Sequence, residues 1–318
     1  MSAGAPAPGA VRWAHVAERG SSAGIRVMAW IHRHVPRVVT EVLLVPVVAY
    51  FWLTGGEARR ASRRHFEAIA RHAPERLPPR PLLGRTFRHF YTFASMLADR
   101  VSFWAGRYEG FDVAFHGREV LEPLGRDGRG GVLLGAHLGS FDVLRVLARD
   151  AGARVNVVMF TSNARRINDL LGALDPTASV RVIEVEPDSI RAAFQIRACV
   201  ERGELVAMLG DRIPPGGRER SIRARFLGRD ASFPEGPFRL SLLLGLPIYS
   251  CVALRTKPTR YDLHFERFSA GHRPTRDERD EEVRDLVERF AAWLERRTLD
   301  APYQWFNFYD FWDREASS

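Results

Sequence analysis

Apolar and polar positions follow two different patterns along the chain. From residue 65 to residue 107, apolar residues such as Phe87 and Phe90 recur at three- and four-residue spacing, which predicts helices. The proline-rich segment 78–81 (PPRP) interrupts this series and predicts a break between two helices. From about residue 111 onward, short β-rich runs alternate with helical ones. This second pattern predicts an α/β fold, a mixed β-sheet flanked by helices.

The elements expected in the α/β part differ in composition and in periodicity. The predicted strands are short runs rich in Val, Ile, Leu and Phe, namely residues 112–117, 131–139, 154–160, 179–185, 204–211, 223–228, 247–255 and 261–268. The predicted helices carry apolar stripes, and they are residues 141–152, 164–174, 189–203, 238–245 and 275–297. We therefore expect a disordered leader over residues 1–10, a helical region over residues 11–105 and an α/β domain over residues 106–318.

An uncharged apolar stretch lies inside the helical region, at residues 42–53. It is shorter than the roughly 20 residues that a spanning helix needs. Tyr50 and Trp52 lie near its end, where interfacial aromatic residues are favoured. The pattern predicts a helix that lies in a membrane interface or spans it marginally, with a buried core helix as the alternative. Its flanks are basic, with Arg26, Arg33, Arg37, Arg59, Arg60, Arg63 and Arg64.

Composition and charge narrow the class of protein only partly. With 46% hydrophobic and 27% charged residues the chain has enough apolar material for a globular core. Cys199 and Cys251 lie far apart without metal-ligand spacing, so we expect a reducing compartment and neither a disulfide framework nor a structural metal. The net charge of +9 favours an acidic partner: nucleic acid, an anionic membrane surface or an acidic carrier protein. Because Lys257 is the only lysine, genome composition also explains part of this charge.

The most informative segment for chemistry is GVLLGAHLGSFD, residues 131–142. An apolar strand leads into His137, and α/β folds bind ligands at the carboxyl edge of the sheet. If Gly139 and Ser140 form a bend, Asp142 can accept a hydrogen bond from one imidazole nitrogen. The other nitrogen is then a base for a hydroxyl or an amine. The alternative is a histidine beside the N-cap of a helix.

A second segment of interest begins where the predicted strand 204–211 ends. Asp211 and Arg212 open a loop rich in proline and glycine, and six arginines crowd the eighteen residues from 212 to 229. Guanidinium groups at this density suit the recognition of phosphate or carboxylate. A solvated basic surface is the alternative.

The order of these motifs resembles one family. GAHLGSFD is similar to the H-x-x-x-x-D/E signature of the lysophospholipid acyltransferase superfamily. The segments GDRIPPGG, FLGRDASFPEG, LLLGLPI and the C-terminal PYQWFNFYDFW are similar to its branch of bacterial lipid A late acyltransferases. The resemblance covers most of the chain. It implies a glycerolipid acyltransferase-like fold and the transfer of a fatty acyl chain from a thioester to a lipid.

The resemblance also implies roles for individual residues. His137 is the general base, and Asp142 orients it. The FPEG motif at residues 233–236 belongs to the acceptor site in the glycerolipid enzymes. Arg212 stands where the lipid A enzymes usually have Gln, which leaves the identity of the acceptor open. We expect the polar head of the acceptor to contact Asp211, Arg212, Arg223, Glu235 and Gly236, while Gly139 and Ser140 are either oxyanion donors or turn residues.

The resemblance finally implies where the protein works and with which partners. The donor is acyl carrier protein or a coenzyme A thioester, no other cofactor is expected, and the location is the cytoplasmic face of the bacterial inner membrane.

An acyl hydrolase with Ser140 as nucleophile is disfavoured because there is no G-x-S-x-G elbow. A non-enzymatic protein that binds nucleic acid or a membrane rests on arginine content alone. We expect the tail from Trp305 to Trp312 to cover the core or to line an acyl groove.

Overall fold

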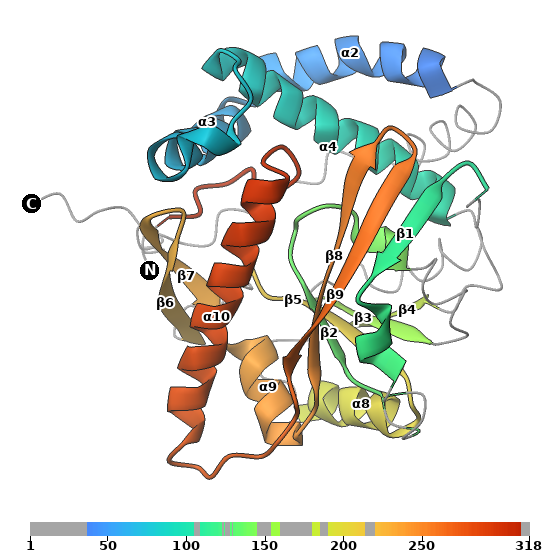
Figure 1. Cartoon of the computed structure of the whole chain (residues 1–318), viewed down its shortest axis with the longest axis vertical. Coiled ribbons are helices and arrows are strands. Elements are labelled where there is room, and N and C mark those ends of the chain that lie inside the picture. The colour runs from blue at the N-terminus through green and yellow to red at the C-terminus, as the bar shows by residue number, and fades with distance from the viewer. Residues whose placement is uncertain are drawn as a thin grey trace, which may run out of the picture.

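Three helices open the part of the chain that the computed structural model describes, which comprises residues 37–104, 109–122, 124, 128, 130–144, 154–159, 180–184, 190–213 and 220–312. They are α2 (Arg37–Thr54), α3 (Gly56–His72) and α4 (Leu82–Trp104). Figure 1 shows them gathered at one end of the molecule, with α2 outermost. The predicted break at the proline-rich segment is confirmed, because α3 ends at His72, the short 3-10 helix η2 (Pro74–Arg76) follows, and α4 begins at Leu82. The leader expected over residues 1–10 lies outside the described residues.

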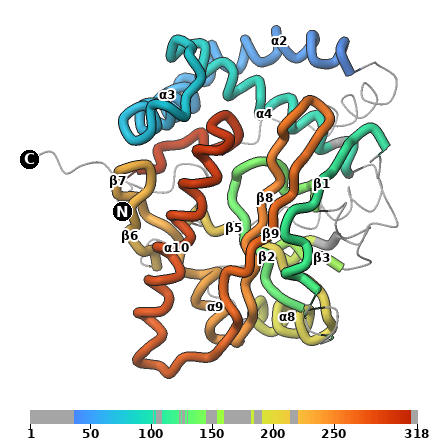
Figure 2. The backbone as a smooth tube through the Cα atoms, viewed as in Figure 1, coloured from blue at the N-terminus to red at the C-terminus, as the bar shows by residue number. Residues whose placement is uncertain are grey.

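Seven strands of the described chain form one sheet, in the order β1-β9-β8-β2-β5-β3-β4. Their bounds are β1 (Asp112–His116), β2 (Val132–Gly135), β3 (Val155–Met159), β4 (Val180–Glu184), β5 (Leu205–Leu209), β8 (Ile248–Lys257) and β9 (Arg260–Ser269). All neighbouring pairs are parallel except β8 and β9, which form the long antiparallel hairpin in the middle of Figure 2. The predicted mixed α/β sheet is therefore confirmed.

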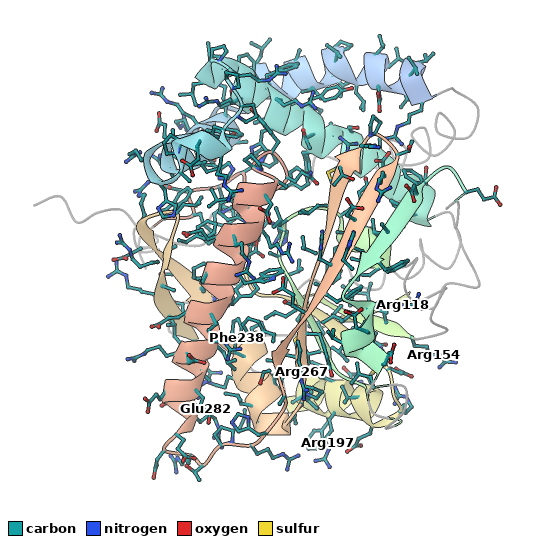
Figure 3. The ribbon with its side chains drawn as sticks, viewed as in Figure 1. Arg118, Arg154, Arg197, Phe238, Arg267 and Glu282 are labelled. Atoms are coloured by element: carbon teal, nitrogen blue, oxygen red, sulfur yellow. The ribbon has the colours of Figure 1, made fainter. Side chains whose placement is uncertain are left out.

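Helices and a separate hairpin complete this part of the molecule. The helices are α8 (Ile190–Glu201), α9 (Gly236–Leu244) and α10 (Arg279–Asp300), and the hairpin joins β6 (Ser221–Phe226) to β7 (Arg229–Pro234). Phe238 of α9 is fully buried, with its ring 5.5 Å from that of Phe290 on α10. In Figure 3 this side chain lies between the two helices, whereas Arg197 and Glu282 project from the outer surface. The helix expected over residues 164–174 lies outside the described residues.

Strand β2 is buried on both faces of the sheet, which is why its sequence is a continuous apolar run. Val132 and Leu134 point into one core, together with residues of α9 and α10. Leu133 points to the opposite side, into a second core that includes Phe103 of α4. The helical region thus contributes to the core that supports the sheet.

The apolar stretch predicted at residues 42–53 forms most of α2, and most of it is exposed. Only Thr40, Leu44 and Val48 are buried, at the four-residue spacing of a single helix stripe. Val42 and Leu53 are each 64% exposed. Among the described helices α2 alone is long and apolar enough to cross a membrane, judged by length and composition. The alternative of a buried core helix is wrong for this segment.

Candidate active site

The loop after β2 lies at the carboxyl edge of the sheet. The strand ends at Gly135, earlier than the sequence predicts, and the chain leaves the sheet at Ala136. Gly139 has a φ of +72°, and a Cβ there would lie 2.0 Å from the carbonyl oxygen of Ala253. Only glycine combines this left-handed conformation with so close an approach of two backbones. The bend expected at Gly139 is therefore present.

Backbone hydrogen bonds fix this loop on both sides. The Gly139 amide donates to the carbonyl oxygen of Gln304 at 2.9 Å, and the Ser140 amide donates to that of Ala253 at 2.9 Å. Ser140 also occupies the N-cap of the short 3-10 helix η4 (Phe141–Val143). Because both amide protons are used by carbonyls of the protein, the geometry favours turn residues over oxyanion donors.

His137 is held by the carboxylate of Asp211. Asp211 follows β5, the strand beside β2, so both residues lie at the same edge of the sheet. The Oδ1 atom of Asp211 lies 2.8 Å from Nδ1 of His137, and its Oδ2 accepts hydrogen bonds from the His137 amide at 3.0 Å and from the Trp305 indole at 3.2 Å. The Asp211 side chain is 1% exposed and that of His137 is 28% exposed. Since a carboxylate only accepts, Nδ1 carries the proton and Nε2 is the basic nitrogen.

The charges around this pair favour a neutral imidazole and an ionised carboxylate. Burial lowers the pKa of His137, and the positive charge of Arg212 lowers it further against the opposing effect of Asp211. Burial alone raises the pKa of Asp211, but its interactions with His137 and Arg212 lower it below its ordinary value. A neutral histidine beside an ionised aspartate is the resting state that a general base requires.

Asp142 does not take the Nδ1 position that the sequence predicts for it. It lies in η4, and its Oδ2 is 3.0 Å from Nε of Arg100 on α4. Ser140, between His137 and Asp142, is extended, with φ −117° and ψ 104°. The hydrogen-bond partner of Nδ1 of His137 is thus Asp211 and not Asp142. A role of Asp142 in the reaction stays a prediction.

Arg212 is fixed by the C-terminal segment. Its Nη2 donates to the carbonyl oxygen of Phe306 at 2.8 Å, and its guanidinium carbon lies 5.5 Å from the centre of the Tyr309 ring. The Phe306 amide in turn donates to the carbonyl oxygen of His137 at 2.7 Å. The structure therefore brings together His137, Asp211 and Arg212, although the sequence assigns the last two to the acceptor.

The FPEG residues lie where β7 passes into α9. Glu235 is the N-cap residue of α9, and both of its carboxylate oxygens accept hydrogen bonds from Arg239 at 3.0 Å. Gly236 faces open space, because a Cβ there would meet nothing within 4 Å. Arg223 is exposed on β6. The role expected for these residues in acceptor binding stays a prediction.

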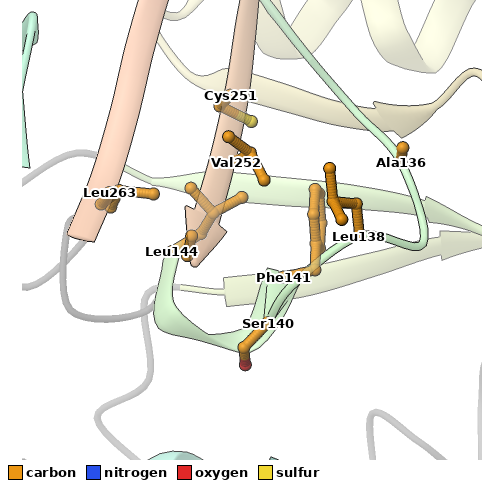
Figure 4. A pocket seen from close by; sticks show the side chains of 9 residues that line it. Ala136, Leu138, Ser140, Phe141, Leu144, Cys251, Val252 and Leu263 are labelled. Atoms are coloured by element: carbon orange, nitrogen blue, oxygen red, sulfur yellow. The ribbon is translucent and has the colours of Figure 1, made fainter. Parts of the chain in front are cut away.

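A small cavity is lined in part by the loop after β2, and Figure 4 shows its largely apolar lining. Phe141 of η4 and the C-cap residue Leu144 contribute to it, together with Cys251 and Leu263 of the β8–β9 hairpin. Its volume is about 10 Å³. That is room for about one water molecule, so an acyl chain does not fit there in this conformation.

Sequence reasoning missed the roles of Asp211 and Trp305 at His137. A usable signal exists for Asp211, because it follows an apolar strand, as His137 does, and adjacent parallel strands end at the same edge. For Trp305 the sequence offers no comparable signal, since it lies 94 positions after Asp211 and reaches it only through the fold.

The fold and this site define a class of protein: an α/β protein with a carboxylate-held histidine at the carboxyl edge of its sheet. The family model for bacterial lipid A biosynthesis acyltransferases matches residues 15–314. Since this match covers most of the chain, the protein belongs to that acyltransferase family. No curated protein matches the chain.

Proposed function

We propose that the protein transfers a fatty acyl chain from an acyl thioester, on acyl carrier protein or coenzyme A, to a hydroxyl or an amine of a lipid acceptor. The observation that carries this proposal is the contact between His137 and Asp211. It combines a part-exposed imidazole with a buried carboxylate on Nδ1, which suits a general base acting through Nε2. Membership in the family supports the type of reaction.

The proposed reaction needs no nucleophile from the protein, because a thioester is already activated. The acceptor oxygen or nitrogen bonds to the thioester carbonyl carbon while its proton passes to Nε2 of His137. The tetrahedral intermediate then breaks its C–S bond, and the imidazolium returns the proton to the leaving thiolate. Asp211 stabilises the imidazolium through Nδ1 and keeps the ring in the productive tautomer.

We assign the binding of the polar head of the acceptor to Arg212, Arg223, Glu235 and Gly236. Arg212 supports this assignment because its positive charge acts on His137, and guanidinium groups bind anionic oxygens. Asp211, which the sequence assigns to the acceptor, is not part of this assignment, because its two carboxylate oxygens already accept hydrogen bonds from His137 and Trp305.

The exposed apolar face of α2 supports a location of the protein at a membrane. We propose that this location is the cytoplasmic face of the bacterial inner membrane. Both proposed substrates carry acyl chains, whose exposure to water costs about 0.8 kcal/mol for each methylene. A site beside the bilayer avoids this cost. Val38, Val42 and Leu53 are more than 60% exposed and provide an apolar surface for such contact.

Comparison of the lipids of a deletion strain with those of its parent tests the proposal. We expect one acylated lipid to disappear and its unacylated precursor to accumulate. The wild-type gene should restore the lipid, the His137→Ala variant should not, and the matched control His116→Ala should. An unchanged lipid profile, or restoration by His137→Ala, would overturn the proposal. With purified protein, release of free fatty acid in place of acceptor acylation would indicate a hydrolase.

A further inference from the structure

Two buried histidines from the helical region bind the C-terminal segment that carries Trp305. His65 of α3 is 1% exposed and His89 of α4 is fully buried. Nε2 of His65 lies 2.8 Å from the carbonyl oxygen of Pro302, and Nε2 of His89 lies 2.9 Å from that of Trp305. Because a carbonyl oxygen only accepts, each ring donates through Nε2.

The second ring nitrogen of His89, Nδ1, is hydrogen-bonded too. Nδ1 lies 2.9 Å from the hydroxyl oxygen of Ser62 on α3, which donates to it. Burial lowers the pKa of His89 well below its ordinary value, and the neighbouring His65 lowers it further. His89 is therefore neutral at physiological pH, with both ring nitrogens hydrogen-bonded and one tautomer selected.

The Trp305 residue that His89 holds reaches the proposed base through two more contacts. The Trp305 indole donates a hydrogen bond to Oδ2 of Asp211, and Oδ1 of Asp211 is hydrogen-bonded to Nδ1 of His137. Trp305 has little freedom to move, because it is 1% exposed and its ring packs against Phe226 at 4.9 Å and against His65 at 5.3 Å. Hydrogen bonds thus link Ser62 of α3 and His89 of α4 to His137, with the backbone and the side chain of Trp305 as the covalent step between them.

We propose that His89 is a positioning residue for the His137–Asp211 pair. Its Nε2 proton fixes the Trp305 carbonyl, the indole then stays on Oδ2 of Asp211, and Oδ1 remains aligned with the imidazole. An apolar residue at position 89 would remove one donor to the buried Trp305 carbonyl, which also accepts a hydrogen bond from the Asn307 amide at 2.9 Å. The helices α3 and α4 therefore take part in building the active site. The kinetic part of this inference rests on the proposed function.

Three variants of the full-length protein in detergent micelles test the inference. His89→Leu removes the donor, whereas His89→Gln offers an amide N–H toward the Trp305 carbonyl. His264→Leu is the matched control, because this half-buried histidine stacks on His116 outside the site, at a ring distance of 4.6 Å. We expect His89→Leu to lower kcat by about tenfold to a hundredfold, the range that small misalignments of a catalytic group produce. His89→Gln should recover most of this loss, and His264→Leu should leave kcat unchanged.

A spectroscopic readout separates this inference from the proposed function. In protein labelled with ¹⁵N-histidine, the Nδ1 proton of His137 reports its hydrogen bond to Asp211 without any turnover. We expect His89→Leu to shift or broaden this resonance and His89→Gln to restore it. The inference would be overturned if folded His89→Leu kept the wild-type kcat and an unmoved Nδ1 resonance. It would also be overturned if His89→Leu and His89→Gln lost equal kcat while that resonance stayed unmoved. If the resonance moves as expected but His137→Ala retains full activity, the proposed function fails and the positioning role stands.

Discussion

Arg37 at the start of α2 forms an ion pair with Asp99 of α4, with 2.9 Å between Nη1 and Oδ1. Asp99 is 1% exposed, and its Oδ2 also accepts hydrogen bonds from the hydroxyl of Tyr261 at 2.7 Å and from Arg255 at 3.3 Å. Tyr261 and Arg255 belong to the β8–β9 hairpin. This carboxylate therefore joins the exposed helix to α4 and to the sheet that carries the site.

Asp99→Ala should destabilise the protein strongly. The substitution leaves two arginines and a buried tyrosine hydroxyl without their shared acceptor, and breaking a buried ion pair costs about 3–5 kcal/mol. We expect the free energy of unfolding, measured by denaturant titration in micelles, to fall by about 3 kcal/mol. Asp300→Ala is the control, because its carboxylate is 39% exposed and lies 3.7 Å from Arg76, so its loss should stay below about 1 kcal/mol. Equal effects of the two substitutions would contradict this role of Asp99.

The exposed face of α2 should hold the protein on membranes. We expect full-length protein to pellet with membranes and to be only partly released by high salt, because salt screens charge but leaves apolar insertion intact. The double substitution Val42→Lys and Leu53→Lys should release much of the protein from the membrane. Leu243→Lys on α9 is the control, because this leucine is 45% exposed, and it should leave the protein bound. Sedimentation with lipid vesicles measures each variant, and release by the Leu243 substitution alone would contradict this assignment.

Gly139→Ala should damage the site through the backbone. An alanine at this φ is strained by about 1–3 kcal/mol, and its Cβ would clash with the Ala253 carbonyl oxygen. We expect a lower melting temperature together with a loss of turnover, since His137 lies two residues away. Gly110→Ala is the control, because a Cβ there would meet nothing within 4 Å. A Gly139→Ala variant with unchanged stability and turnover would show that the loop can adopt another path.

The acid limb of the pH profile should follow His137. As pH falls, the imidazole takes up a proton and can no longer act as a base, so kcat/KM falls. Burial and the charge of Arg212 lower the pKa of His137, with Arg100 adding to the effect and Asp211 opposing it, so the midpoint should lie below the ordinary value of 6.5. Arg212→Gln removes one positive charge and should move the midpoint to higher pH.

Arg223→Gln is the matched control for that shift. Because Arg223 is exposed on β6, we expect the pH midpoint to stay unchanged. The KM for the acceptor should rise more than the KM for the donor, as loss of a head-group contact predicts. A midpoint that moves down in Arg212→Gln, or that moves equally in both variants, would contradict the electrostatic account of His137.

The sequence predicts the α/β class, the position of His137 and the bend at Gly139 because each depends on local pattern. Apolar runs define β2 and β5, and a glycine between a histidine and a helix start indicates a turn. The exposure of α2 does not follow from its composition, since an apolar helix fits either a protein core or a membrane. Only its packing against α4 shows that one narrow stripe is buried.

The partner of His137 could not be predicted from spacing. Asp142 is close in sequence, but the extended Ser140 and the 3-10 turn after it carry Asp142 to Arg100. Asp211 is distant in sequence, and it reaches the imidazole because β2 and β5 are adjacent and end at the same edge. Contacts across a sheet depend on strand order, which local periodicity does not encode.

The turnover number of Asp211→Asn, compared with that of Asp142→Asn in equally folded protein, tests most directly which carboxylate serves the base. An amide at position 211 cannot stabilise the imidazolium, and such a change at a histidine-holding aspartate can cost about 10⁴-fold in kcat. We expect the loss for Asp211→Asn to approach the loss for His137→Ala, and the loss for Asp142→Asn to be clearly smaller. Near wild-type turnover of Asp211→Asn, with Asp142→Asn as inactive as His137→Ala, would contradict the assignment of Asp211 as the partner of the base.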